Sequence, residues 1–382
     1  MEQLKKIIKS KINNNSIFFR VIRKVYFQLS SIKYKILNYN KIKQENKRFK
    51  SEINQAIVEI EKCFQKEYIV FYNPTWLGVA NSTKGLFQNI VPLEQVYKSK
   101  DAKRIAETIN KSKINCVIFS QIVDGWTNII EMIKIINPKI DIKVIWHGNC
   151  YEFFSDYTWK LNQEVIKLYN EKKIQAFGFV RSTMKEFFEK VGVNSYYLQN
   201  NVHLLPQKLK DHTINTKSKI GIYNSDSREL KNIYTALAAV KLIPNAMADV
   251  VPISKGAKEY CNIIKLDISS VDYYISTNDL LNRIQENVIN IYPTYTENSP
   301  MFPLESFEMG IPCLLGNNND FFIGTPLEEY VVIKKEDDIE YIKNKIQNCI
   351  SNKEKVMNLY KQWKKEFDIK CNNLVTTFVK NI

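Results

Sequence analysis

The stretch from Val288 to Pro312 reads VINIYPTYTENSPMFPLESFEMGIP, and it decides how the C-terminal half of the chain folds. Residues 288–293 are a short apolar run closed by a proline, which predicts a buried strand. Pro303 stands where the first residue of a helix is favoured, because its missing N–H costs nothing there. Gly310 and Pro312 predict the end of that helix, with Gly310 at a position that tolerates a left-handed backbone.

Two carboxylates flank the boundary between this strand, its loop and its helix. We expect Glu297 on the loop and Glu305 in the first turn of the helix. The unpaired backbone N–H groups from Met301 to Glu305 would face the same crevice and suit a phosphate. Ligands of open α/β sheets bind at this carboxyl edge of the strands. The pair therefore predicts a shared ligand site, with an ordinary surface loop as the alternative.

Apolar runs alternate with amphipathic stretches along most of the chain. This rhythm predicts parallel sheets with crossover helices, interrupted by a polar interdomain linker over residues 206–218. The strands expected are 68–72, 116–119, 144–146, 176–179, 196–198, 220–223, 248–253, 263–266, 288–293, the region of Leu314, and 331–333. The helices expected are 49–64, 101–112, 125–135, 158–173, 181–191, 229–242, 278–286 and a closing helical segment over 336–380.

The loop and helix around the two glutamates resemble the donor-binding signature of the retaining GT-B glycosyltransferases, family-4 group. Glu297 to Pro300 reads Glu-Asn-Ser-Pro, and Glu305, Gly310 and Pro312 match the family's Glu-x-x-x-x-Gly-x-Pro. The resemblance covers roughly residues 66–350, more strongly in the second half. It implies an α/β fold of two Rossmann-like domains facing a cleft, as in enzymes that build bacterial polysaccharides and lipooligosaccharides.

On this resemblance the chain is expected to contain four parts. Residues 1–50 form a basic amphipathic helical extension, and 51–207 form the N-terminal Rossmann-like acceptor domain. Residues 208–352 form the C-terminal Rossmann-like donor domain, and the helices of 353–382 cross back to the N-terminal domain. The segment LQNNVH, ending at His203, resembles the family's Asn-Gly-Val-Asp turn before the linker.

The resemblance also implies roles for particular side chains. Glu297 would face the sugar of a nucleotide-sugar, and Glu305 would accept hydrogen bonds from the ribose hydroxyls. The rest of the donor-binding loop would comprise Asn298, Ser299, Pro300, Met301 and Phe302. His147 stands at the end of a first-domain strand, where the family often has a histidine that touches the donor sugar; a structural hydrogen-bonding role is the alternative.

Cations are needed near the diphosphate that leaves in such a reaction, because positioned charges there are a large catalytic contribution. The family's Gly-Arg pair after the first strand of the donor domain is missing here. Lys231 and Arg228 are the available replacements, unless both decorate the exposed start of a helix. On the acceptor side, Gly78 and Asn81 belong to an expected glycine-containing loop after the first strand, which a plain turn would also explain.

Metal and cofactor chemistry has little support in the sequence. The seven cysteines are scattered without a Cys-x-x-Cys pair, and there are only three histidines. These counts argue for free thiols in a reducing cytoplasm and against a zinc site. No Asp-x-Asp occurs, so we expect metal-independent transfer with no cofactor besides the nucleotide-sugar co-substrate. No apolar run approaches the ~18 residues of a membrane span, and the start lacks a signal-peptide pattern.

Charge is concentrated at the N-terminus. Residues 1–50 contain 14 Lys and Arg but only two Glu, so they carry +12 of the net +15. Phe18, Ile22, Val25 and Leu29 recur at helical spacing among them. This pattern favours an anionic membrane surface at the inner face, and hence a lipid-linked glycan acceptor. A helix packed on the body or a nucleic-acid-binding arm are the alternatives, the latter disfavoured by the nearly neutral body.

The function expected is thus transfer of a sugar from a nucleotide donor to a glycan in envelope polysaccharide synthesis. A nucleotide-sugar epimerase on the same fold is one alternative, distinguished by turnover of donor without acceptor. A non-catalytic protein that holds nucleic acid through its basic segment is another, distinguished by salt-dependent binding that is lost with the segment.

Overall fold

The computed structural model describes residues 48–96, 98–202, 218–223 and 229–380. The chain divides into two compact units, Met1–Gln55 and Ala56–Ile382. The described part of the small unit, residues 48–55, is helical. Nearly all of the predicted extension over 1–50 and of the predicted linker over 206–218 lies outside the described residues.

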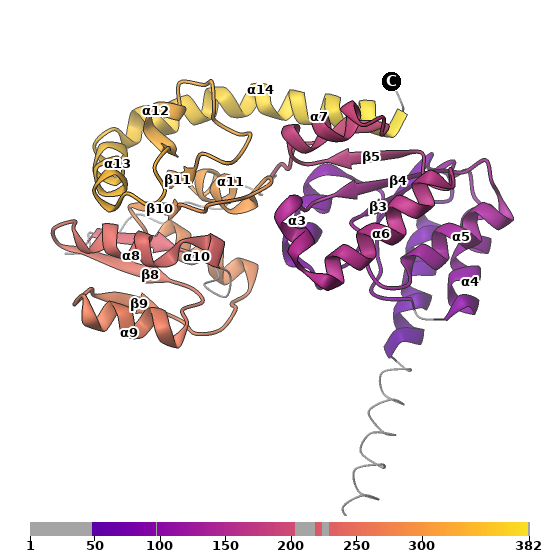
Figure 1. The fold of residues 1–382 in the computed structure, drawn as a ribbon, viewed down its shortest axis with the longest axis horizontal. Helices are drawn as coiled ribbons and strands as arrows, with labels where there is room; N and C mark the ends of the chain where they lie inside the picture. The colour runs from indigo at the N-terminus through magenta and orange to yellow at the C-terminus, as the bar shows by residue number, and fades with distance from the viewer. Residues whose placement is uncertain (1–47, 97, 203–217, 224–228, 381–382) are drawn as a thin grey trace, which may run out of the picture. The chain divides into compact units, whose positions relative to one another are not determined.

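The large unit contains two six-stranded parallel sheets with helices between successive strands (Figure 1). The first sheet has the order β2-β1-β3-β4-β5-β6, with strands β1 Tyr68–Tyr72, β2 Ile90–Pro92, β3 Cys116–Ser120, β4 Asp141–Trp146, β5 Ala176–Phe179 and β6 Ser195–Tyr197. The second has the order β12-β11-β10-β7-β8-β9, with strands β7 Ser218–Ile222, β8 Ala246–Val250, β9 Ile268–Ser270, β10 Ile289–Tyr292, β11 Cys313–Gly316 and β12 Val332–Ile333.

Helices connect the strands within each sheet. In the first half they are α3 Leu77–Leu86, α4 Ser99–Asn110, α5 Trp126–Ile136, the 3-10 helix η1 Cys150–Phe154, α6 Asp156–Asn170 and α7 Ser182–Lys190. In the second half they are the 3-10 helix η2 Glu229–Lys231, α8 Ile233–Lys241, α9 Lys255–Ile263, α10 Thr277–Gln285, α11 Met301–Glu308, α12 Glu328–Val331, α13 Ile339–Ser351 and α14 Lys353–Lys380.

The predicted fold class, α/β with two Rossmann-like domains, is confirmed. Strands such as β1 (YIVFY) and β3 (CVIFS) are near-continuous apolar runs, because both faces of a parallel sheet are covered by helices. Read from β9 to β12, the second sheet has the doubly wound order 3-2-1-4-5-6. In each sheet the strand order reverses beside the first strand, at β1/β3 and at β7/β10. These switch points are where open α/β sheets bind ligands.

Some local predictions were wrong. Residues 263–266 are the end of α9 and a turn, and the strand follows at Ile268–Ser270, because periodicity does not separate short apolar runs into helix and strand. The donor-loop helix begins at Met301 rather than Pro303, so Glu305 lies in its second turn. Gly310 does adopt the expected left-handed backbone, with φ +80°.

The prediction of a glycine-containing acceptor-side loop after the first strand was also wrong, because Gly78 and Asn81 lie inside helix α3. Tertiary contacts outweigh the low helix propensity of glycine there. The hydroxyl of Ser82 donates to Asn200, and Thr83 is fully buried. Gly85 allows the helix to approach closely, since a Cβ at this position would lie 2.1 Å from the carbonyl oxygen of Asn201.

Helix α14, which is yellow in Figure 1, contributes buried side chains to the cores of both sheets. Tyr360 and Phe367 are buried in the core of the second sheet, whereas Phe378 near the end of the helix is fully buried in the core of the first. The phenyl ring of Phe378 fits against Gly178 of β5. The buried Lys143 of β4 donates from Nζ to the carbonyl oxygen of Phe378 (2.5 Å), a favourable place for a cation at a helix C-terminus.

Truncating Phe378 should therefore separate the end of α14 from the first sheet. We expect Phe378→Ala to lower the free energy of unfolding by about 3–5 kcal/mol, since it leaves a cavity in a packed core. Ile369→Ala, at a 64% exposed position on the same helix, should change it by less than about 0.5 kcal/mol. Urea denaturation of both variants checks this, and equal effects would contradict the described docking of α14.

Candidate functional site

The candidate site lies at the switch point of the second sheet, at the ends of the paired strands β7 and β10, where the strand order reverses. β10 ends at Tyr292, and the loop that follows leads to Glu297 and then into α11. A cleft of ≈ 550 Å³ opens here. It is lined by Asn149, Tyr151, Glu152, Phe154, Ser155, Thr158, Glu229, Leu230, Lys231, Thr296, Glu297 and Asn298.

Lys231 and Glu297, both predicted from the sequence, meet in this cleft. Their ammonium and carboxylate form an ion pair, with side chains only 16% and 15% exposed. Tyr292 completes the group: its hydroxyl accepts from Lys231 Nζ (2.7 Å) and donates to Glu297 Oε1 (2.7 Å). Lys231 thus holds its charge at the end of β10, oriented by two partners. An anionic ligand that bound here would share this cation with Glu297.

The position of Lys231 depends on a break in the helix predicted over 229–242. η2 ends at Lys231, and Asn232 adopts a left-handed backbone with φ +53° before α8 begins. Asparagine tolerates this conformation. Its side-chain amide donates to the carbonyl oxygens of Pro293 (3.0 Å) and Glu336. The break therefore attaches the start of α8 to the loop after β10.

Glu305 lies in α11, after the loop that lines the cleft, and is not itself among the lining residues. Its side chain is 8% exposed, and burial raises its pKa to about 7. Among the described residues it has no hydrogen-bond or ion-pair partner. Pro300, the N-cap residue of α11, has no side chain that can accept a hydrogen bond. The first backbone N–H groups of the helix, at Met301 and Phe302, therefore have no side-chain cap. An uncapped helix start and a buried, unpaired carboxyl group suit a ligand carrying both phosphate and hydroxyl groups.

A buried polar network holds α11 on β10. Asn290 of β10 donates to Ser306 Oγ (2.7 Å), and Ser306 donates to the carbonyl oxygen of Ile311 (2.7 Å). Asn287 donates to both Asn290 Oδ1 (2.8 Å) and Tyr223 OH (2.7 Å). Because Ser306 adjoins Glu305, this network orients Glu305 relative to the strand. The sequence did not reveal this network, because an Asn within a strand indicates only low strand propensity and does not show which side chain it hydrogen-bonds.

His147 lies at the corresponding edge of the first sheet, directly after β4. Its Nε2 lies 2.8 Å from Ser120 Oγ, which lies 2.6 Å from Thr83 Oγ1. The Thr83 hydroxyl donates to the carbonyl oxygen of Val79 (2.8 Å), so Ser120 donates to Thr83 and accepts from His147 Nε2–H. Burial lowers the pKa of His147 to about 4. The ring is therefore neutral at pH 7, with Nδ1 as a hydrogen-bond acceptor.

Other predicted donor-loop residues have different surroundings. Asn298 lines the cleft, and its Oδ1 is buried without a hydrogen-bond partner among the described residues. Ser299 accepts from the backbone N–H of Asn200 (3.1 Å), and Phe302 packs between the rings of Tyr223 and Tyr292. Arg228 lies outside the described residues, as does His203.

Sequence reasoning missed the polar contacts that join the two sheets' loops beside the cleft. Arg181 donates to the carbonyl oxygens of Glu297 and Asn318. Asp320 Oδ2 accepts from the backbone N–H of Ser182 (2.6 Å) and from Tyr197 OH (3.0 Å). No local spacing marks such pairs, because each joins residues more than a hundred positions apart. Arg181 thereby holds the backbone of Glu297 from the first-sheet side.

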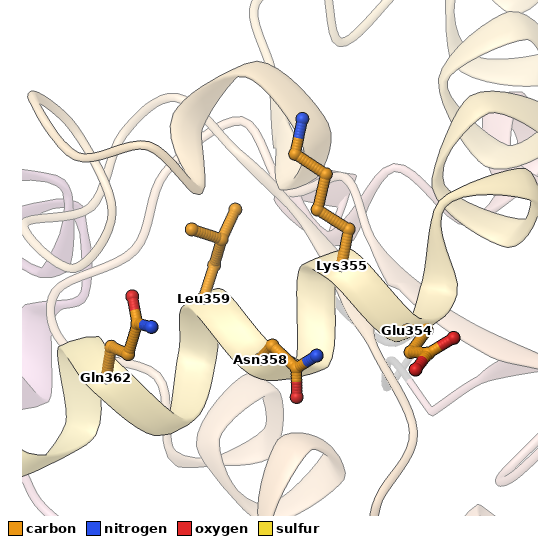
Figure 2. Close-up of a pocket in the computed structure, with 5 residues that line it drawn as sticks. All are labelled: Glu354, Lys355, Asn358, Leu359 and Gln362. Carbon is orange, nitrogen blue, oxygen red and sulfur yellow. The ribbon is translucent and has the colours of Figure 1, made fainter.

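A second hollow, of ≈ 350 Å³, lies on α14. Figure 2 shows its lining side chains, which all come from that one helix: Glu354, Lys355, Asn358, Leu359 and Gln362. Lys355 already donates to Tyr330 OH (2.6 Å). Its lining residues all come from one helix, so no polar groups from separate elements converge there, and we do not assign it a ligand.

Within the described residues, no group of three His, Cys, Asp or Glu side chains is placed to hold a metal ion. No helix of this part of the chain is long and apolar enough to cross a membrane.

Comparison with known proteins supports the fold. No family model matches the chain, and no curated protein matches it in sequence. Sucrose-phosphate synthase from Thermosynechococcus elongatus is similar in structure with a TM-score of 0.53 at 10% identity, over 81% of this chain and 96% of that one. The apo lipopolysaccharide outer core galactosyltransferase WaaB gives 0.52 at 9%, over 81% and 99%.

An α,α-trehalose-phosphate synthase (UDP-forming) from Burkholderia xenovorans, in complex with glucose-6-phosphate, gives a TM-score of 0.57 at 7% identity. The match covers 82% of this chain and 99% of that one. At these identities the likeness shows the fold alone. The chain has the two-domain GT-B fold of glycosyltransferases.

Proposed function

We propose that this protein is a glycosyltransferase that takes its sugar from a nucleotide-sugar donor. The observation that carries the proposal is the buried, unpaired carboxyl group of Glu305 beside the uncapped start of α11, one loop away from the Lys231–Glu297 pair. A ribose diol would donate to Glu305. The N–H groups of α11 and the ammonium of Lys231 would bind the diphosphate.

The sugar would then lie between the two sheets' loops. Glu297 and Asn298 line the cleft on one side and offer acceptors to sugar hydroxyls. His147 would offer Nδ1 from the end of β4, oriented by Ser120, although it is not among the residues that line the described cleft. We also assign donor binding to the end of the loop and the start of α11. These residues would contribute backbone groups and the shape of the site: Ser299, Pro300, Met301 and Phe302. Arg228 is kept as a second cation candidate on sequence grounds.

Retention of configuration is the stereochemical outcome that we propose. The bond from the anomeric carbon to the donor phosphate breaks while the acceptor oxygen forms a new bond on the same face of the sugar. The acceptor proton passes to the departing phosphate oxygen. The protein then contributes mainly position and charge, through the helix start and Lys231. Because these groups can stabilise the diphosphate and the sequence lacks Asp-x-Asp, we propose that transfer needs no metal ion or other cofactor.

We further propose a lipid-linked glycan acceptor in envelope polysaccharide synthesis, at the cytoplasmic face of the membrane. The support is the +12 charge of residues 1–50, which would be attracted to anionic lipid. Gly78 and Asn81, exposed and half-buried on α3, remain candidates for the acceptor side. Nucleic acid is a poor candidate partner, since the remaining residues are nearly neutral.

Glu305→Gln should abolish donor binding. Wild type should be stabilised by one class among UDP-, GDP-, CMP- and dTDP-sugars, by about 2.7 kcal/mol at 100 times Kd. UDP-sugars come first because a structural neighbour is described as UDP-forming. Glu340→Gln, an exposed change on α13, should bind as wild type does. Thermal unfolding with and without each donor measures this; equal stabilisation of the Glu305 variant would contradict the assignment.

Donor affinity should also depend on pH through Glu305. Its pKa is about 7 in the free protein, and ribose hydroxyls stabilise the ionised form. Affinity should therefore rise between pH 6 and 7.5 and level off above. Without ligand, ionisation of this buried group should lower stability as pH rises from 4.5 through 7. Calorimetric titration across this range tests both, and affinity that falls with rising pH would refute the role.

Lys231→Met should lower kcat by about 10²- to 10³-fold with little loss of fold, because it removes the positioned cation from the leaving phosphate. Lys231→Arg should retain part of the rate. Lys255→Met, at an exposed lysine of α9, is the matched control. Steady-state kinetics with the donor identified above gives the comparison; unchanged kcat in Lys231→Met would show that the cation lies elsewhere.

Deleting residues 1–45 should release the protein from anionic phosphatidylserine vesicles without altering donor-induced stabilisation. The reason is that most of the +12 charge of residues 1–50 is lost. Vesicle co-sedimentation measures the effect, with neutral phosphatidylcholine vesicles as the control. Vesicle binding that survives the deletion would remove the membrane assignment.

A further inference from the structure

Tyr151 and Phe154 are exposed aromatic residues on the first-sheet side of the cleft, 45% and 84% exposed. Both belong to η1, and a 3-10 helix places residues three apart on the same face. Their ring centroids lie 5.5 Å apart. Phe153, between them, instead packs against Trp146 and Trp159. η1 thus presents two rings to the cleft while a third anchors it to the domain.

Exposure of these rings costs stability, since burying a Phe side chain is worth about 1.5–3 kcal/mol. Their surroundings are polar: the hydroxyls of Ser155 and Thr158 and the carboxylate of Glu152 line the same cleft. Aromatic faces bordered by hydroxyl and carboxylate groups are complementary to a pyranose. Its C–H bonds carry partial positive charge toward a ring face, and its hydroxyl groups radiate toward hydrogen-bond partners.

The charged side chains of the cleft also restrict which ligand it can bind. The described cleft residues contributed by the first domain include Glu152 and no Lys or Arg. On the other side, Glu229 adds a carboxylate, and Lys231 is the cation that the proposed function assigns to the donor diphosphate. A phosphate on the acceptor would therefore meet carboxylates, which disfavours it. One structural neighbour was solved with glucose-6-phosphate, so an acceptor without phosphate would be a departure from that protein.

We propose that Tyr151 and Phe154 form an acceptor platform on which an uncharged pyranose unit of a glycan stacks, facing Glu297. The proposal rests on the proposed function and names the class of its acceptor. This platform would favour neutral glycan ends over sugar phosphates. A lipid surface is less suited to this face, because Glu152 and Asp156 would oppose an anionic membrane.

The test is ligand-observed NMR with maltopentaose, cellopentaose and chitopentaose as neutral probes and glucose 6-phosphate as the charged one. Wild type should bind at least one neutral probe and bind glucose 6-phosphate more weakly. The double variant Tyr151→Ala, Phe154→Ala should bind that neutral probe about tenfold more weakly. Phe154→Tyr, which keeps a ring, should bind as wild type does. Tyr273→Ala, at a 65% exposed tyrosine of the second domain, is the matched control.

Three results would overturn the platform: equal or tighter binding of glucose 6-phosphate, no binding of any neutral probe, or neutral binding that the double variant leaves unchanged. Loss of binding to phosphatidylserine vesicles in the double variant, with glycan binding intact, would assign the rings to lipid instead. Donor-induced stabilisation is measured in parallel on the same variants. If it is present while glycan binding fails, the platform alone is wrong; if it is absent while glycan binding is lost in the double variant, the platform stands and the transferase assignment fails.

Discussion

The parallel arrangement of both sheets is the constraint on which the site depends. Every strand in a parallel sheet ends at the same edge, so the segments after β3, β4 and β10 gather polar residues without any local pairing between them. Where the strand order reverses, adjacent loops turn away from each other and leave room for a ligand. The apolar strands provide a rigid support, and function is left to the short segments that follow them.

Buried polar groups hydrogen-bond the strands to the helices and so fix the position of α11 relative to β10. Asp249 of β8 accepts from Tyr223 OH and pairs with Arg283 of α10, and Asn287 and Asn290 extend the network to α11. Gly221 of β7 makes the network possible, because a Cβ there would lie 1.9 Å from Asn290 Oδ1. Buried polar networks whose members are hydrogen-bonded make a core rigid and favour one arrangement over others. Here the arrangement that they favour sets α11 on β10.

The carboxyl groups of Glu297 and Glu305 differ in pairing and burial because of their surroundings. Glu297 is paired with a lysine and a tyrosine hydroxyl, whereas Glu305 is buried without a side-chain partner in the part of the chain that the structure describes, and burial raises its pKa to about 7. A ligand that brings hydroxyl groups to Glu305 and a phosphate to Lys231 would satisfy both at once. The same logic extends to His147, whose neutral ring is oriented by a hydroxyl chain rather than by a carboxylate.

The sequence by itself determined the fold class, most strand positions, the left-handed turn at Gly310, and the loop that carries Glu297 and Glu305. These follow from local signals: apolar runs, proline and glycine positions, and strand–helix alternation. Only the tertiary structure decided that Lys231 pairs with Glu297, that Gly78 lies in a helix, and that η1 turns Tyr151 and Phe154 toward the cleft. Each of these outcomes depends on contacts between residues distant in the chain, whose energies no local spacing encodes.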